Sequence, residues 1–283
     1  MFSIVIPTFN NLDYLKLCLT SIKNNSNYDH EIIIHINQGN DGTKKFLENN
    51  RYKFTYSDQN VGLCSAVNIA SKISTKKYII YAHDDMYFCP NWDKVLNSEI
   101  SGYSNDLFYL SATMIEPNSG HIKFNCGEIP NNFNEKKLIE NLDNLTFYDF
   151  QGSHFAPHLI SKRLWDEVGG FSEEFNPGKC SDPDLNMKLW KNGVRIFKGI
   201  NNFKVYHFSS VTINKQRKIK LNNGHITFLK KWKITDKFFK KHYLRYLSVY
   251  NGPLRDPNKN IIYFLELIIC KVKMFFYILT NKK

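Results

Sequence analysis

The feature that most restricts the fold is an alternation of short apolar runs with amphipathic segments across residues 1–110. The apolar runs are FSIVIP at 2–7, HEIIIHI at 30–36, KFTYS at 53–57 and KYIIYA at 77–82. Between them, residues 11–25 and 62–73 carry apolar side chains at helical spacing. Strands that alternate with helices indicate βαβ units. We therefore predict an α/β fold with a mostly parallel central sheet flanked by helices.

In a sheet of this kind, ligands bind beyond the carboxyl ends of the strands. The loops that follow Pro7, Ile36 and Ala82 are therefore expected to share one crevice. The last of these loops holds two adjacent carboxylates, Asp84 and Asp85, in the stretch IIYAHDDMYF. Adjacent like charges beside a buried strand indicate either a strand-ending turn or a site that holds a cation.

The rest of the first 214 residues is less regular. Residues 107–115 and 204–208 are predicted to form strands, and residues 161–171 a helix with Ser161 as its N-cap. Residues 182–193 form the clearest helix, which Asp182 can cap and Gly193 can end.

Charge divides the chain into two parts. From residue 215 onward there are 17 Lys and Arg against three acids, a net charge of +14, whereas residues 1–214 carry a net charge of −2. We therefore predict two units, residues 1–214 and a basic helical extension at 215–283 that is rich in aromatic and aliphatic residues.

The cysteines and the first residues bear on the compartment. The six cysteines are scattered without a CxxC pair, which favours reduced, buried thiols over a disulfide framework. The opening MFSIVIPTFNN lacks a basic start and a small-residue cleavage site. We expect no signal peptide and a cytoplasmic protein.

Seven segments, taken in order, resemble the GT-A domain of glycosyltransferase family 2 over roughly residues 2–208. They are FSIVIPTFNN, EIIIHINQGNDGT, NVGLCSAVN, YIIYAHDDM, GGFSEEF, SDPDLNMKLWKNG and VYH. The resemblance implies a nucleotide-sugar donor, expected to be a UDP-sugar, a Mn²⁺ or Mg²⁺ ion, and inversion at the sugar carbon. A divalent cation held by carboxylates suits this chemistry, because it neutralises the leaving diphosphate.

The resemblance also implies roles for individual residues on the donor side. Asp85 is expected to bind the metal, and His207 to complete the metal site, although a lone His on a strand is also often a structural group. The residues expected to bind the donor are Pro7, Thr8, Phe9, Asn37, Gly62 and Asp84.

On the acceptor side, inversion needs a base that takes the proton of the acceptor hydroxyl. In the segment SDPDL, Asp182 aligns with the family's base and Asp184 is the second candidate. The alternative for Asp182 is a purely capping role, and the two roles are compatible. His154 or His158 is a candidate for contact with the acceptor.

The apolar stretch 261–280 is about as long as a bilayer span, but Glu266, Lys271 and Lys273 interrupt it. We expect it to lie in the interface of an anionic membrane, on the inner face, with spanning and packing on the body as the alternatives. Such a location suits a lipid-linked saccharide acceptor.

The sequence thus predicts a metal-dependent inverting glycosyltransferase that acts on a saccharide, in cell-surface polysaccharide or glycolipid synthesis. Two other functions remain. A sugar nucleotidyltransferase usually has a Gly-rich, basic loop after the first strand, which PTFNNLDY lacks. A nucleic-acid-binding protein would use the basic, aromatic extension, but its long aliphatic runs favour a membrane, and no nucleic acid partner is expected.

Overall fold

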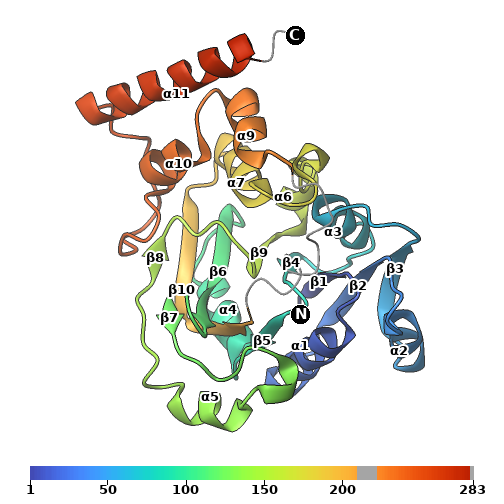
Figure 1. The fold of residues 1–283 in the computed structure, drawn as a ribbon. Helices are drawn as coiled ribbons and strands as arrows, with labels where there is room; N and C mark the ends of the chain where they lie inside the picture. The colour runs from blue at the N-terminus through green and yellow to red at the C-terminus, as the bar shows by residue number, and fades with distance from the viewer. Residues whose placement is uncertain (209–221, 281–283) are drawn as a thin grey trace.

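The computed structural model describes residues 1–208 and 222–280 (Figure 1). Its strands are β1 (Ser3–Thr8), β2 (Glu31–Asn37), β3 (Lys53–Ser57), β4 (Tyr78–Tyr81), β5 (Met86–Phe88), β6 (Phe108–Glu116), β7 (Ile122–Lys123), β8 (Phe150–Gln151), β9 (His158–Ser161) and β10 (Ile196–His207). Its α-helices are α1 (Leu12–Asn25), α2 (Thr43–Asn49), α3 (Leu63–Ser71), α4 (Trp92–Ser101), α5 (Glu135–Asn141), α6 (Lys162–Glu167), α7 (Ser181–Lys191), α9 (Gly224–Trp232), α10 (Asp236–Phe239) and α11 (Ile261–Thr280).

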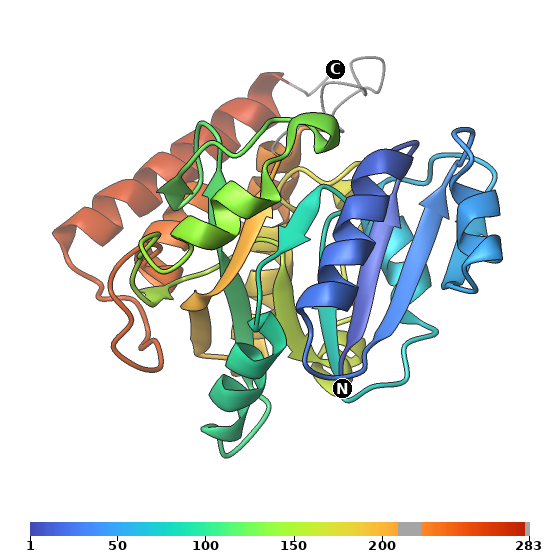
Figure 2. The same cartoon turned by 90° about the horizontal axis from the view of Figure 1, so that it is seen from below.

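The described strands form one sheet in the order β3-β2-β1-β4-β9-β6-β10-β5. In addition, β7 pairs with β6 and β8 pairs with β10. Strands β1 to β4 are parallel, as predicted. The chain moves outward from β1 to β3 and then returns to β4 on the other side of β1. Right-handed crossovers therefore place α1 and α3 on opposite faces of the sheet, as Figure 2 shows. The strand order reverses between β1 and β4, where a ligand crevice is expected.

The other half of the sheet is mixed, which the sequence did not indicate. The short strand β9 lies antiparallel between β4 and β6, and β5 lies antiparallel to β10. The final strand is longer than the predicted 204–208 and pairs with β6 along its length, with a register shift between Ile200 and Lys204. Buried side chains on both sides of this strand remove the period-two pattern that would reveal its full extent.

The helix predictions hold within a few residues. Ser161 caps α6 by accepting a hydrogen bond from the backbone N–H of Leu164. The helix α7 is present but begins at Ser181, so Asp182 lies inside its first turn and Cys180 occupies the cap position. The prediction that Asp182 caps this helix is wrong, because the cap lies two residues earlier, at Cys180.

The C-terminal helices pack on the body. Phe228, Phe238, Phe239 and Leu244 belong to the same buried core as the strands. The predicted division between residues 214 and 215 falls within 209–221, outside the described residues, and stays a prediction. Helix α11 lies along the outside of this end of the molecule (Figure 1). Among the described helices, none combines the length and the apolar composition that crossing a membrane requires.

Candidate active site

The carboxyl end of β4 carries the two adjacent aspartates. Asp84 and Asp85 are 4% and 5% exposed, and they stand in the turn that joins β4 to β5. The amide of Asn11, in the loop after β1, donates to Oδ1 of Asp84 at 3.0 Å. The loops after β1 and β4 therefore meet at the point where the strand order reverses.

His207 reaches the same place from the far end of the sequence. In the antiparallel pair of β5 and β10 it lies opposite Met86, the neighbour of Asp85. Nε2 of His207 is 3.3 Å from Oδ1 of Asp85, and Nδ1 lies 2.7 Å from Oε1 of Glu116 at the end of β6. A second partner on Nδ1 fixes the orientation of the ring, so Nε2 faces Asp85.

His83 completes a cluster around Asp85. Its Nδ1 is 3.9 Å from Oδ1 of Asp85, and its ring centroid is 5.9 Å from that of His207. One ligand atom from each of these three residues lies within 4.8 Å of the other two. The sequence predicted Asp85 and His207 but not His83, although His83 directly precedes the two aspartates.

The electrostatics of the cluster favour a cation. Burial acts to raise the pKa of Asp85, but the charge of His207 outweighs it and holds the pKa below its usual value. Burial acts to lower the pKa of His207, but Asp85 and Glu116 outweigh it and raise the pKa to about 10. Burial lowers the pKa of His83 to about 4, so this ring is neutral.

The donor set fits a divalent metal. Oδ1 of Asp85 is buried and makes no hydrogen bond of normal geometry with any described residue. A carboxylate with two imidazoles suits a transition metal such as Mn²⁺ better than Mg²⁺, which prefers oxygen ligands throughout. The residues that could hold such an ion are Asp85, His83 and His207, with Glu116 as the orienting partner of His207.

A pocket of about 410 Å³ adjoins Asn11, the partner of Asp84. It is lined by the loop after β1, by Asp41, and by residues 129–131. Asp41 accepts hydrogen bonds from the backbone of Leu12 and from Thr43 at the start of α2, so the DGT segment forms a turn and a helix start. Hydrogen-bonded turns therefore line this pocket, which lies next to Asp84 through Asn11.

The first turn of α7 presents the second pair of aspartates. Burial raises the pKa of Asp182 to about 7, and its Oδ1 is inaccessible to solvent and makes no hydrogen bond to any described residue. A carboxylate with an unbonded oxygen and a pKa near neutral pH can accept a proton from a nearby hydroxyl. Removal of the acceptor proton is the role that the family resemblance assigned to Asp182, and it stays a prediction.

Asp184, the second candidate base, has a different environment. It is fully buried and accepts hydrogen bonds from Ser172 at 2.6 Å and from the indole of Trp232 at 2.8 Å. Lys231 lies 3.0 Å from it. A carboxylate held by three partners is poorly suited to remove a proton, and it instead joins α7 to α9.

Asp84, Asp85 and Asp182, but not Asp184, act on a common side chain, Tyr81, the last residue of β4. After burial, the charge of Asp182 and then the charges of Asp85 and Asp84 raise the pKa of this phenol. The Tyr81 ring contacts His83 and His158, with centroids 5.4 and 5.2 Å apart. The loop after β4 and the start of α7 therefore border one region around Tyr81.

The residues predicted to bind the donor lie at the ends of β1 and β2 and at the start of α3. Pro7 and Thr8 end β1, and Phe9 follows half-buried. The side chain of Asn37 is already engaged, because it donates to Asn60 and accepts from the backbone of Val61, both at 2.8 Å. Their contact with a donor stays a prediction.

The presence of glycine at position 62 has a structural reason. Its φ is +82°, and a Cβ there would lie 2.4 Å from the side-chain oxygen of Asn176. That Asn176 oxygen accepts from the backbone N–H of Cys64 at 2.9 Å, so it caps α3 from a distant part of the chain. The glycine is needed for this approach, whatever its role toward a donor.

The two histidines expected near an acceptor differ. Nδ1 of His154 lies 3.0 Å from the carbonyl of Gly152, and its ring packs against Tyr246. His158 is buried beside Tyr81, and its Nε2 makes no hydrogen bond to any described residue. His158 is thus the one that borders the site.

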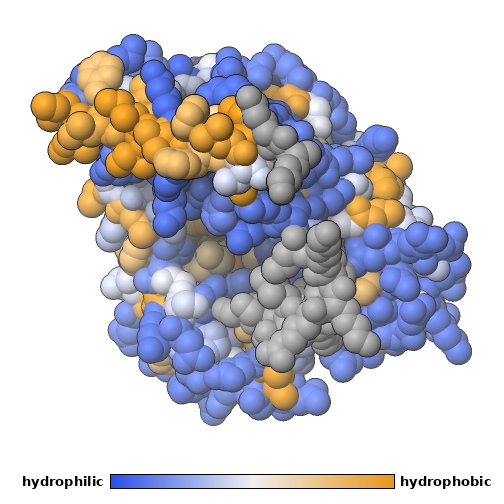
Figure 3. Space-filling view, turned by 45° about the horizontal axis from the view of Figure 1, so that its top comes forward, coloured by the Kyte–Doolittle hydropathy of each residue, from blue (hydrophilic) through white to orange (hydrophobic). Residues whose placement is uncertain are grey.

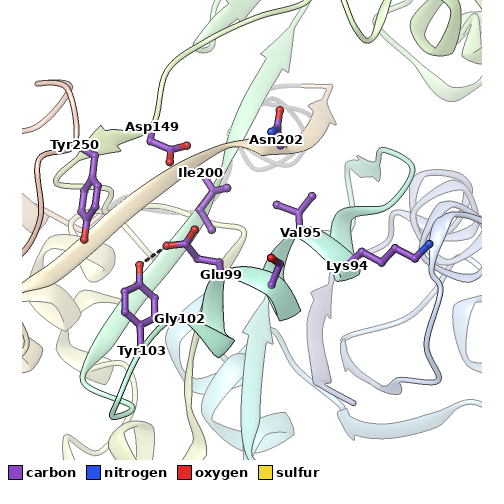
Figure 4. Close-up of a pocket in the computed structure, with 10 residues that line it drawn as sticks. Lys94, Val95, Glu99, Gly102, Tyr103, Asp149, Ile200, Asn202 and Tyr250 are labelled. Atoms are coloured by element: carbon purple, nitrogen blue, oxygen red, sulfur yellow. Dashed lines mark hydrogen bonds between the residues drawn. The ribbon is translucent and has the colours of Figure 1, made fainter.

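A second pocket, of about 620 Å³, lies between α4 and β10 (Figure 4). Its carboxylates, Glu99 and Asp149, are paired with Lys198 at 2.9 and 2.8 Å, and Glu99 also bonds Tyr103. Because these charges are neutralised within the protein, we place the candidate active site at the strand ends and not in this pocket.

Comparison with solved structures shows the same fold in glycosyltransferases. S. aureus TarS 1–349 matches with a TM-score of 0.55 and 16% identity over 73% of this chain and 60% of that chain, and the same fragment has been solved with UDP and with UDP-GlcNAc. GalNAc-T7, solved with UDP, GalNAc and Mn²⁺, matches with a TM-score of 0.61 and 15% identity over 86% of this chain and 50% of that chain.

The chain spans about 60% of the TarS fragment that it matches. No curated protein matches the sequence significantly. At such low identity the likeness establishes the GT-A fold, and the predicted fold class is confirmed.

The family assignment comes from the sequence itself. The sequence model of the family Glycosyl transferase family 2 matches residues 3–166, more than half of the chain. This match covers the strands β1 to β6 and the two aspartates after β4. The chain therefore belongs to glycosyl transferase family 2.

Proposed function

We propose that this protein is a metal-dependent, inverting glycosyltransferase that moves a sugar from a nucleotide-sugar donor to a saccharide acceptor. The observation that carries the proposal is the meeting of two unlike carboxylates around Tyr81. Asp85 lies beside His83 and His207 with its pKa lowered, whereas Oδ1 of Asp182 makes no hydrogen bond to any described residue and the pKa of Asp182 is raised to about 7.

These environments support a division of roles. A divalent ion held by Asp85, His83 and His207 would neutralise the diphosphate leaving group. Asp84, held by Asn11 beside the 410 Å³ pocket, is placed to orient the nucleoside. Asp182, ionised above about pH 7, accepts the proton of the acceptor hydroxyl as its oxygen attacks the sugar.

The donor class is tested by thermal unfolding of the full chain against a panel of nucleotide sugars, with UDP-sugars first. We expect one donor to raise the midpoint temperature only when Mn²⁺ is present, because ligands that bind the folded state stabilise it. The effect should vanish with EDTA and in Asp85→Asn. Equal stabilisation without metal, or none by any donor, contradicts the proposal.

We further propose that α11 attaches the enzyme to the anionic inner face of the cytoplasmic membrane, where a lipid-linked saccharide would be its acceptor. One face of α11 packs on the body through Tyr263 and Cys270, which are 7% and 2% exposed. Most of the remainder is apolar and exposed, and it forms a continuous band in Figure 3. The exposed side chains are Ile261, Ile262, Phe264, Leu265, Ile268, Ile269, Val272, Phe275, Phe276, Ile278 and Leu279.

The charged residues of α11 support its binding to a membrane surface. Glu266, the one acid in the helix, pairs with Lys241 and lies 2.7 Å from His242. Lys271 and Lys273 are exposed beside the apolar band. An amphipathic helix with an apolar face and basic flanks binds anionic bilayers through both features.

Flotation of the full chain with vesicles tests this attachment. We expect binding to vesicles with phosphatidylserine and less binding to neutral ones. Ile268→Glu with Phe275→Glu, two residues that are 55% and 59% exposed, should abolish flotation without unfolding the protein. The matched control is Lys94→Glu, on α4. Undiminished flotation of the double variant contradicts the proposal.

A further inference from the structure

Away from the strand ends, the described residues hold one other cluster with metal-binding side chains: Cys180, His225 and Asp236. Cys180 immediately precedes α7, His225 lies in the first turn of α9, and Asp236 begins α10. One ligand atom from each lies within 4.8 Å of the other two. The cluster therefore joins the helix that carries Asp182 to the C-terminal helices.

The distances argue against a nucleophile and base relay. Nδ1 of His225 lies 2.8 Å from Oδ1 of Asp236 and 3.3 Å from Sγ of Cys180. In a catalytic triad the nucleophile and the carboxylate contact opposite ring nitrogens. Here both approach the same nitrogen, which can make a good hydrogen bond to one of them at most.

The same distances suit ligands of one ion. Zinc bonds of about 2.0 Å to nitrogen and oxygen and 2.3 Å to sulfur, in tetrahedral geometry, place ligand atoms about 3.3–3.6 Å apart. The observed separations of 2.8 and 3.3 Å need only a small outward movement of His225. His225 is able to move, because its side chain is 48% exposed.

The three ligands stand on fixed backbone. A Cβ on Gly224 would lie 1.9 Å from the carbonyl oxygen of Lys179, so the start of α9 is in backbone contact with the residue before Cys180. Thr235 caps α10 through the backbone N–H of Phe238 at 3.1 Å. Lys240 lies 3.4 Å from Oδ2 of Asp236, which leaves Oδ1 facing the cluster.

A thiolate, an imidazole and a carboxylate form a donor set typical of Zn²⁺, and the two anions balance its charge. We propose that Cys180, His225 and Asp236 bind Zn²⁺, with the Cys180 thiol proton released to solvent and a water as the fourth ligand. This site fastens the first turn of α7, and with it Asp182, to α9 and α10. It does not depend on the proposed transferase activity.

Cobalt substitution tests the site in the full chain. After treatment with EDTA, Co²⁺ should produce the near-ultraviolet charge-transfer absorption of a cobalt thiolate, and one equivalent of Zn²⁺ should remove it. Cys180→Ser should abolish the absorption. Cys126→Ser is the matched control and should keep it, because the other five cysteines are buried and Cys126 is 3% exposed.

Two further variants complete the test. Asp85→Asn should keep the cobalt thiolate absorption, which separates this site from the donor-site metal. His225→Asn, at an exposed position, should weaken zinc binding by at least about 100-fold and remove the increase in midpoint temperature on adding zinc. No thiolate absorption in the wild type, absorption that survives Cys180→Ser, or zinc affinity unchanged in His225→Asn would each overturn the proposal.

Discussion

The loop after β4 and the first turn of α7 each present two aspartates, and the two regions treat them in opposite ways. After β4, Asp84 accepts a hydrogen bond from Asn11, and Asp85 lies beside His207, which favours the charged state of Asp85. At the start of α7, Asp184 has three partners, whereas Oδ1 of Asp182 makes no hydrogen bond to any described residue.

This difference shows that the surroundings of a residue decide its role. Neighbouring aspartates can stabilise the structure, hold a positive charge or accept a proton. A carboxylate beside a cationic group stays ionised and holds positive charge, as expected of Asp85. A carboxylate with a buried, unbonded oxygen resists ionisation and can gain a proton near neutral pH, as expected of Asp182. The predictions below test this contrast in order of expected effect.

Asp182→Asn should have the largest effect. Because an amide cannot accept the proton, the transfer rate at saturating donor should fall by about 10²- to 10⁴-fold. The measurement is a single-turnover assay with the donor identified by the thermal screen. Asp184→Asn is the control, and it should keep most of the rate. A comparable loss in both variants would remove the distinction between the two aspartates.

Asp85→Asn should mainly affect metal binding. It removes the anion between His83 and His207, so Mn²⁺ affinity should fall by more than about 100-fold, with donor affinity falling alongside. Isothermal titration with Mn²⁺ measures the change. Asp106→Asn, a surface carboxylate paired with Arg163, is the control and should leave Mn²⁺ affinity unchanged.

Glu116→Gln should have a smaller effect of the same kind. Glu116 orients His207 through Nδ1, and losing an outer partner of this type typically reduces metal affinity by about 10–100-fold. Glu116→Asp should restore part of the affinity, because it retains the charge. Unchanged Mn²⁺ affinity in Glu116→Gln would show that the ring is held by other contacts.

Asp184→Ala should affect stability more than the metal site. It leaves the indole N–H of Trp232 and the hydroxyl of Ser172 without their buried acceptor, which should lower the free energy of unfolding by roughly 1–3 kcal/mol. Denaturant unfolding measures it, with Asp182→Asn as the comparison. If Asp182→Asn destabilises the protein equally, the assignment of Asp184 to structure is wrong.

The first half of the fold and the central residues of the site were predictable from the sequence. The four parallel strands have apolar runs, and Asp84, Asp85 and Asp182 stand in recognisable segments at strand and helix ends. The confirmed family and fold follow from the same segments.

The rest depends on contacts between distant residues. Glu116 lies 91 residues from His207 in the sequence, and Asn176 caps α3 from 112 residues away. The antiparallel β9 has only four residues, too few for a clear period. Similarly, nothing in the segment SDPDL separates Asp182 from Asp184, because their difference comes from Ser172, Lys231 and Trp232.

The most direct test of the central claim, that Asp182 removes the acceptor proton, is the pH dependence of the single-turnover transfer rate at saturating donor and Mn²⁺. Burial raises the pKa of Asp182 to about 7, so the base is protonated and inactive below that pH. The rate should rise about tenfold per pH unit up to about pH 7 and then level off, and Asp182→Asn should lose this dependence. A wild-type rate that is constant between about pH 5 and 8, or the same rise in Asp182→Asn, would contradict it.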